Sequence, residues 1–208
     1  MLYIGFSGVL IGFVPLTAII ISYFSFYLWS DKYIQYDDNT SGLVACILLA
    51  ELLLNYKDII KLVFFDNEEK IRKGSEEFIK NNSELIIDRL KVLNLDCVGR
   101  GKHIAISFSE GKILKRKNEF KSKFLLFLEL KKIYHLRSGS SRCDCKSFAV
   151  SGFDAFTLHR AERGMFDTIN LGWPHSQDDK LEHINIKYLL EIVLVAQEFI
   201  LQTINDEK

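Results

Sequence analysis

The first 30 residues carry no charged side chain, and this constrains the chain more than any other feature of its sequence. Asp31 is the first charged residue. A membrane-spanning helix needs about 20 consecutive apolar residues, so the stretch over residues 2–28 is long enough, even with Pro15 inside it. We therefore expect residues 1–30 to be a transmembrane segment and residues 31–208 to form a domain. The alternative is that the segment forms a buried helix or two buried strands of that domain.

The flanks of this segment bear on how the chain would sit in a membrane. Tyr27 and Trp29 lie at its end, where aromatic side chains favour the boundary between lipid and water. No lysine or arginine precedes the segment, and only Lys32 follows it closely. The expected localisation is a single-pass membrane protein, and the excess of basic residues that orients such proteins is too small to predict the side on which the domain lies.

Composition excludes several other classes of protein. Lysine and arginine together number 27, as do aspartate and glutamate, so the formal net charge is zero and no overall field favours nucleic acid. Hydrophobic residues make up 48% of the chain and charged residues 26%, which excludes a disordered chain. Cys143 and Cys145 are separated by one residue, a spacing that matches no common zinc motif, and the four cysteines predict no disulfide framework. We expect no nucleic-acid partner.

After the apolar segment, stretches with the composition of strands alternate along the sequence with stretches of helical periodicity. The expected strands lie at residues 59–65, 86–95, 103–108, 148–150 and 167–171. The expected helices lie at residues 43–55, 74–80, 120–128, 154–162 and 186–200, and Thr40 or Ser41 would cap the first of them. Residues 112–132 are rich in lysine, and we expect an amphipathic helix packed on the sheet, with contact to an anionic membrane surface as the alternative. The alternation predicts an α/β domain with a mainly parallel sheet flanked by helices.

Acidic residues and one histidine follow apolar runs of this domain. They are Asp38, Glu68, Glu69, Asp96 and His175. Ligands of open α/β sheets gather at the carboxyl ends of the strands, so these side chains are expected to converge. Carboxylates with one imidazole suit a divalent metal such as zinc. Neighbouring side chains of an extended chain point to opposite sides, so one of the two adjacent glutamates could bind metal while the other acts as a base. The alternative for that pair is a solvated surface feature.

Four short runs carry a resemblance to a known family, the zinc-dependent aminopeptidases, which also include glutamate carboxypeptidases. The order and spacing are similar from about Asp37 to the C-terminal helix. The runs are Tyr36-Asp37-Asp38-Asn39-Thr40-Ser41-Gly42, Val63-Phe64-Phe65-Asp66-Asn67-Glu68-Glu69, Asn94-Leu95-Asp96-Cys97-Val98-Gly99 and His175-Ser176-Gln177-Asp178-Asp179.

The resemblance implies a role for each of the five residues. Asp38 would bridge two zinc ions, Glu69 and His175 would bind one of them, and Asp96 would bind the other. Glu68 would be the general base that takes a proton from the attacking water. The implied activity is removal of an N-terminal residue, or in some members a C-terminal residue, from a peptide substrate.

The sequence departs from the family in one respect that matters for chemistry. The family has a further zinc-binding histidine upstream of the bridging aspartate, whereas residues 1–37 contain no histidine. The family domain is thus expected to be N-terminally incomplete here. Three explanations stay open: the sequence is a truncated reading of a longer domain, the protein is a one-metal enzyme, or it is a catalytically inactive relative that acts as a binding or scaffold domain. The other histidines, His103, His135, His159 and His183, are not expected to replace the missing one.

Overall fold

The structure is a computed structural model, and it describes residues 35–69, 71–82, 84–85, 89–107, 118–138, 143–164, 169–171 and 174–206. The predicted transmembrane segment over residues 1–30 lies outside the described residues, as do residues 86–88 and 167–168 of two predicted strands.

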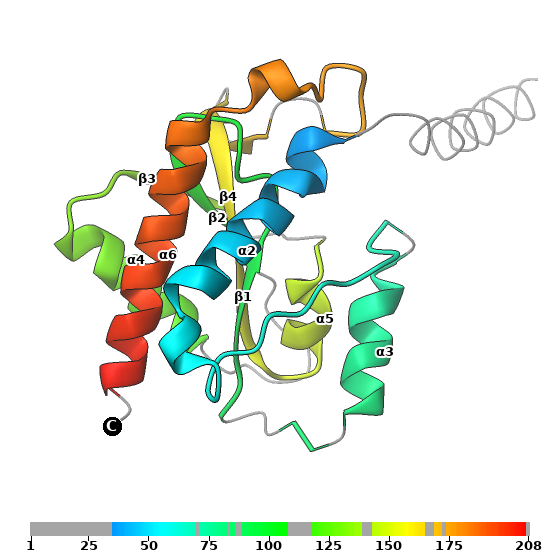
Figure 1. The fold of residues 1–208 in the computed structure, drawn as a ribbon, viewed down its shortest axis with the longest axis vertical. Helices are drawn as coiled ribbons and strands as arrows, with labels where there is room; N and C mark the ends of the chain where they lie inside the picture. The colour runs from blue at the N-terminus through cyan, green and yellow to red at the C-terminus, as the bar shows by residue number, and fades with distance from the viewer. Residues whose placement is uncertain are drawn as a thin grey trace, which may run out of the picture.

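A mixed sheet lies at the centre of the described domain (Figure 1). Its strands stand in the order β1-β4-β2-β3, and the short β5 pairs with β4. The strands are β1 (Lys91–Leu95), β2 (His103–Ser107), β3 (His135–Ser138), β4 (Asp154–Arg163) and β5 (Ile169–Asn170). β4 runs parallel to β1 but antiparallel to β2, and β2 runs parallel to β3. The prediction of an α/β sheet flanked by helices is confirmed, but the sheet is mixed rather than mainly parallel, because β4 runs antiparallel to both β2 and β5.

Strand β4 occupies residues 154–162, where the sequence predicted a helix. Its first eight residues are all buried, because layers of structure cover both faces of the sheet. A strand buried on both faces lacks the alternation of apolar and polar residues that identifies a half-buried strand. Leucine, alanine and arginine within the same stretch are good helix formers, which favoured the wrong assignment.

Two further strand predictions fail, and three hold at least in part, among them that over 167–171, where β5 forms. Residues 148–150 belong to helix α5 (Cys145–Val150). Residues 59–65 form no strand and make no described ladder with β1. The predicted strand over 103–108 is confirmed as β2, and that over 86–95 is confirmed at its C-terminal half as β1.

Four predicted helices are confirmed. They are α2 (Gly42–Leu52), α3 (Lys73–Asn81), α4 (Glu119–Leu130) and α6 (Ile186–Asp206), joined by the 3₁₀ turns η2 (Leu54–Tyr56) and η4 (Leu181–His183). Helices α2, α4 and α6 share one hydrophobic core with β1, β2 and β4, while α5 and α3 pack on the opposite face of the sheet. Figure 1 shows α2 and α6 crossing in front of the strands. The domain therefore has three layers.

The apolar face of α4 lies in the main core, as expected for a helix packed on the sheet. Phe124 is fully buried, and its ring centroid lies 5.1 Å from that of Phe156 on β4 and 4.8 Å from that of Phe199 on α6. Such aromatic contacts add about 0.5–1.5 kcal/mol beyond area burial. The Asn118 side chain caps the helix by accepting from the Lys121 N–H at 2.8 Å, and it donates to the Ala155 carbonyl at 2.7 Å.

Helix α6 also binds the most buried charged side chain among the described residues. Arg160 of β4 is 1% exposed, and its guanidinium donates to the carbonyls of Tyr188 and Lys102 and pairs with Glu191. Among the described residues, α6 is the one helix long and apolar enough to cross a membrane. Its buried residues, including Ile192 and Phe199, belong to the core, so we interpret it as a core helix.

Candidate metal centre

The loop that carries Asp38 is fixed against the end of β1 by side chains of its own run. The Asn39 side chain donates to the Leu95 carbonyl at 2.9 Å and accepts from the Gly42 N–H at 3.1 Å. Ser41, one of the two predicted caps, is the N-cap residue of α2, but its side chain makes no cap bond, and the Asn39 side chain accepts from the first helical N–H instead. A Cβ at Gly42 would lie 2.5 Å from the Leu95 carbonyl oxygen, so this approach requires glycine.

A second set of bonds joins this loop to the residues that follow Asp96. The Ser41 hydroxyl donates to the Asp37 carbonyl at 2.8 Å and accepts from the Val98 N–H at 2.9 Å. The Asp37 carboxylate accepts from the Gly99 N–H at 2.7 Å. These bonds set the distance between the two acidic loops before any ligand binds.

The loop after β5 brings His175 to the same place. Its Nε2 lies 3.2 Å from Asp38 Oδ2 and 3.3 Å from Glu69 Oε1. Zinc bonds to nitrogen and oxygen of about 2.0–2.1 Å, meeting at a tetrahedral angle, place two ligand atoms about 3.3–3.4 Å apart. The His175 nitrogen thus stands at tetrahedral ligand separations from both oxygens, and the two oxygens lie within 4.8 Å of each other. A neutral imidazole with two carboxylates is a donor set that zinc accepts.

Asp96 follows β1 and faces Asp38. One oxygen of each carboxylate and the sulfur of Cys97 all lie within 4.8 Å of one another. The structure therefore brings together all four residues that the sequence singled out as metal ligands, Asp38, Glu69, Asp96 and His175.

The carboxylates of this cluster are partly removed from solvent and repel one another, and both effects raise the pKa values of Asp38 and Glu68. Burial, followed by repulsion from Asp96, Glu69 and Glu68, raises the pKa of Asp38 to about 8. Burial and then the charge of Glu69 raise the pKa of Glu68 to about 8. Carboxylates that repel one another in a poorly solvated place are stabilised by a divalent cation, which reverses these shifts.

The two adjacent glutamates differ in their surroundings. The Glu69 side chain is 57% exposed and reaches His175, whereas Glu68 is half-buried and interacts with Glu69 and Asp96 electrostatically. If the pair were a solvated surface feature, both side chains would be exposed to a similar extent. The half-buried position and the raised pKa of Glu68 are typical of a carboxylate that exchanges a proton during catalysis.

Sequence reasoning missed Asp179, which positions the Asp38 loop. Its buried carboxylate accepts from the N–H of Asp37 at 2.8 Å and from that of Asp38 at 3.1 Å. The signal was its place in the run that begins at His175.

His159 was also judged wrongly. It was expected in a helix, but it lies on β4, where Nδ1 is 2.7 Å from the Asp96 carbonyl oxygen and Nε2 is 2.5 Å from Ser107 Oγ. Donor atoms of Asp96, Cys143 and His159 lie within 4.8 Å of one another. His103 and His135 lie elsewhere in the sheet. The His103 ring contacts Tyr134 edge-to-face, and His135 is hydrogen-bonded to the Ile133 carbonyl.

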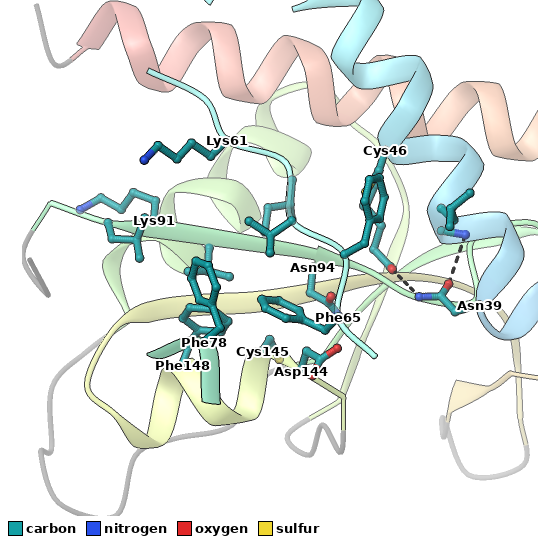
Figure 2. A pocket seen from close by; sticks show the side chains of 18 of the residues that line it. Asn39, Cys46, Lys61, Phe65, Phe78, Lys91, Asn94, Asp144, Cys145 and Phe148 are labelled. Carbon is teal, nitrogen blue, oxygen red and sulfur yellow. Dashed lines mark hydrogen bonds between the residues drawn. The ribbon is translucent and has the colours of Figure 1, made fainter. Parts of the chain in front are cut away.

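A cavity of about 290 Å³ adjoins the site and shares Asn39 with it. Figure 2 shows Phe65, Phe78 and Phe148 along its apolar wall. It lies between β1 and the extended residues 61–65, because that segment leaves the edge of β1 unpaired. None of the four ligand candidates lines it, so we place the chemistry at the carboxylate cluster rather than in this cavity.

The fold is similar to solved structures of zinc aminopeptidases. BSAP, a zinc aminopeptidase from Bacillus subtilis, matches with a TM-score of 0.64 at 19% identity, covering 80% of this chain and 42% of that one. An aminopeptidase from Aneurinibacillus sp. strain AM-1 matches with a TM-score of 0.64 at 21% identity, covering 79% and 39%. The LapA aminopeptidase of Legionella pneumophila gives 0.54 at 16% identity, covering 78% and 44%. The chain thus spans less than half the length of these proteins.

Sequence comparison gives the family directly. Among curated protein sequences, none matches the chain significantly. The family model described as Peptidase family M28 matches residues 36–200, a range that contains the Asp38 loop, both glutamates, Asp96 and His175. The chain therefore belongs to peptidase family M28.

Proposed function

We propose that the protein is a zinc-dependent exopeptidase of the aminopeptidase type. Asp38, Glu69 and His175 would hold a zinc ion, and Asp96 would serve a second ion beside Asp38. One observation carries the proposal: the His175 nitrogen stands 3.2 and 3.3 Å from two carboxylate oxygens that come from distant parts of the chain. A histidine between two carboxylates also forms ion pairs at these distances, and a tetrahedral zinc ion would take the same three donor atoms as ligands.

The proposed chemistry assigns a different role to each of the two adjacent glutamates. Zinc, when bound, would polarise the scissile carbonyl and make the attacking water more acidic. Glu68 would accept the proton of that water and pass it to the leaving amine, because its half-buried carboxylate lies beside the ligand candidates Glu69 and Asp96. Peptides are the implied substrates.

The competing function is a catalytically inactive M28 relative that acts as a binding or scaffold domain. The observation that favours an enzyme is Glu68, because its carboxylate is half-buried beside Glu69 and Asp96 and, among the described residues, takes part in no side-chain hydrogen bond.

We also propose that residues 1–30 anchor the domain in a membrane. The support is the uncharged apolar length of that segment, which exceeds the roughly 20 residues needed to span.

The test of the metal site compares two histidine variants. His175→Gln should lose bound zinc and the hydrolysis of aminoacyl-nitroanilide substrates, because an amide is a poor zinc ligand. His135→Gln on β3 is the matched control and should retain both. Zinc is measured by elemental analysis on folded protein. Retention of zinc in His175→Gln would contradict the proposed site, and zinc binding without hydrolysis in the wild type would favour the inactive domain.

A further inference from the structure

The cavity beside β1 lies along an edge of the sheet that, among the described residues, pairs with no strand. β1 pairs with β4 on its other side, and residues 61–65 run past the unpaired edge without forming a ladder. Such an edge presents a row of backbone N–H and C=O groups, to which an extended peptide can add as a further strand. The volume of about 290 Å³ is at the lower end of the range for small-molecule sites, which suits a short segment.

Apolar side chains would cover both faces of a strand added in this cavity. Phe65, Phe78 and Phe148 line it on the side of α3 and α5, and Leu43 and Cys46 line it on the side of α2 (Figure 2). Neighbouring side chains of an extended chain point to opposite faces, so consecutive residues of the occupant would all contact apolar walls. The occupant is therefore expected to be apolar along its length.

A buried carboxylate lies at one end of the cavity. Asp144 lines it and is 9% exposed, and its Oδ1 has no hydrogen-bond partner among the described residues. Asp144 follows Cys143, whose sulfur lies 3.1 Å from Oγ1 of Thr157, the β4 residue that pairs with Asn94. A buried acceptor without a donor is costly, and an ammonium group with three N–H donors would satisfy it.

Two lysines lie at the other end of the cavity (Figure 2). Lys61 and Lys91 both line it, and Lys91 is the first residue of β1, three positions before Asn94. Three positions along a strand span about 10 Å. An extended peptide of about three residues covers the same length, so its ammonium would reach Asp144 while its carboxylate reaches the lysines.

We propose that this cavity binds short apolar peptides of about three residues, which add to β1 as an antiparallel strand with the ammonium at Asp144 and the carboxylate at Lys61 and Lys91. The direction follows from the charges, because Asp144 lies near the C-terminal end of β1 and Lys91 begins it. The same charges select peptides in which both termini are free. None of the four metal-ligand candidates lines the cavity, so this binding needs no metal and goes beyond the proposed function.

Isothermal titration calorimetry of the full-length protein, with a chelator present, tests the site with trileucine. We expect trileucine to bind, and triglycine to bind at least about tenfold more weakly because it buries no apolar side chain. N-acetyl-trileucine and trileucine amide each lack one terminal charge. Each should bind about tenfold or more weakly than trileucine, since a hydrogen bond to a charged group contributes about that much to affinity.

Variants of the protein connect each terminus of the peptide to its partner. Asp144→Asn should weaken trileucine about tenfold and leave N-acetyl-trileucine unchanged, because that peptide has no ammonium group. Replacement of both Lys61 and Lys91 by glutamine should weaken trileucine similarly and leave the amide unchanged. Asp58→Asn and Lys57→Gln are the matched controls and should alter neither affinity, since both residues are exposed and lie outside the cavity lining.

Several results would overturn the proposal. Failure of trileucine to bind is one, and equal affinity for trileucine and triglycine or N-acetyl-trileucine is another. If Asp144→Asn does not fold, the comparison of trileucine with its N-acetyl form on the wild type still tests the ammonium site. Binding that is lost in His175→Gln would place the peptide at the carboxylate cluster and would also overturn the proposal. The proposed function is tested separately by zinc content and hydrolysis, so these results leave it standing.

Discussion

The Asp179 carboxylate accepts a hydrogen bond from the backbone N–H of Asp38 at 3.1 Å, and so it positions a metal-ligand candidate without facing the metal. Its other oxygen accepts from the N–H of Asp37 at 2.8 Å. An aspartate satisfies both donors, whereas an asparagine offers one acceptor oxygen and turns an N–H₂ group towards the second donor.

Asp179→Asn should therefore weaken zinc binding. Loss of a residue that orients a metal ligand typically costs about 10–100-fold in affinity, and we expect a loss in this range. Competition with a chromophoric chelator measures it. The neighbouring Asp178→Asn is the control, since Asp178 is exposed and its side chain makes no described bond to the Asp38 loop. Equal affinity of both variants would show that Asp179 does not position the site.

The metal-free protein should lose stability as pH rises. Asp38 and Glu68 titrate near 3.8 and 4.5 when unfolded and at about 8 in the folded chain. Between these values the folded state holds more protons than the unfolded state, so the free energy of unfolding falls as pH increases. Thermal unfolding with a chelator present should give a lower Tm at about pH 8 than at about pH 5, and saturating zinc should raise the Tm more at about pH 8.

Glu68→Gln tests how much this one carboxylate contributes to the decrease in Tm with rising pH. The decrease should be smaller in Glu68→Gln, whereas Glu77→Gln, on the exposed side of α3, should leave it unchanged. A Tm of the metal-free wild type that rises from about pH 5 to about pH 8 would contradict the assigned burial of these carboxylates.

Arg160→Met should destabilise the fold strongly. The change leaves the buried carbonyls of Lys102 and Tyr188 without their donor and Glu191 without its partner, at a cost of about 2–4 kcal/mol. Arg137→Met is the control, because its ion pair with Glu129 is half-exposed on both sides and is worth about 1 kcal/mol or less. Chemical denaturation measures both, and similar losses would show that Arg160 does not connect β4 to α6.

Deletion of residues 1–30 should release the protein from membranes. The remaining chain has its one long apolar helix, among the described residues, in the core of the domain. Carbonate extraction of membranes from cells that express the full-length or the shortened chain distinguishes the two. A full-length chain that is already in the soluble fraction would show that residues 1–30 belong to the folded domain.

The place of Asp96 could be predicted from the sequence, because the apolar run before it forms β1 and the carboxylate follows the end of that strand. The run before Glu68 and Glu69 forms no strand, so the prediction of convergence held there without the predicted strand. Helical periodicity likewise predicted α6 and the buried face of α4. Strand β4 could not be predicted, because burial on both faces removes its alternation. The nearness of His159 to Asp96 depends on how β1 and β4 pair, and no local pattern encodes that pairing.

The central claim, that Glu69 binds metal while Glu68 transfers a proton, is tested most directly by one pair of variants. Zinc content and the rate of aminoacyl-nitroanilide hydrolysis are measured for Glu68→Gln and Glu69→Gln beside the wild type. The account predicts that Glu69→Gln loses zinc, since an amide is a poorer ligand. Glu68→Gln should keep its zinc and lose about 10²–10⁴-fold in turnover, the usual contribution of a general base. Equal zinc content and equal rates in the two variants would contradict the account, and loss of zinc in Glu68→Gln alone would reverse the two roles.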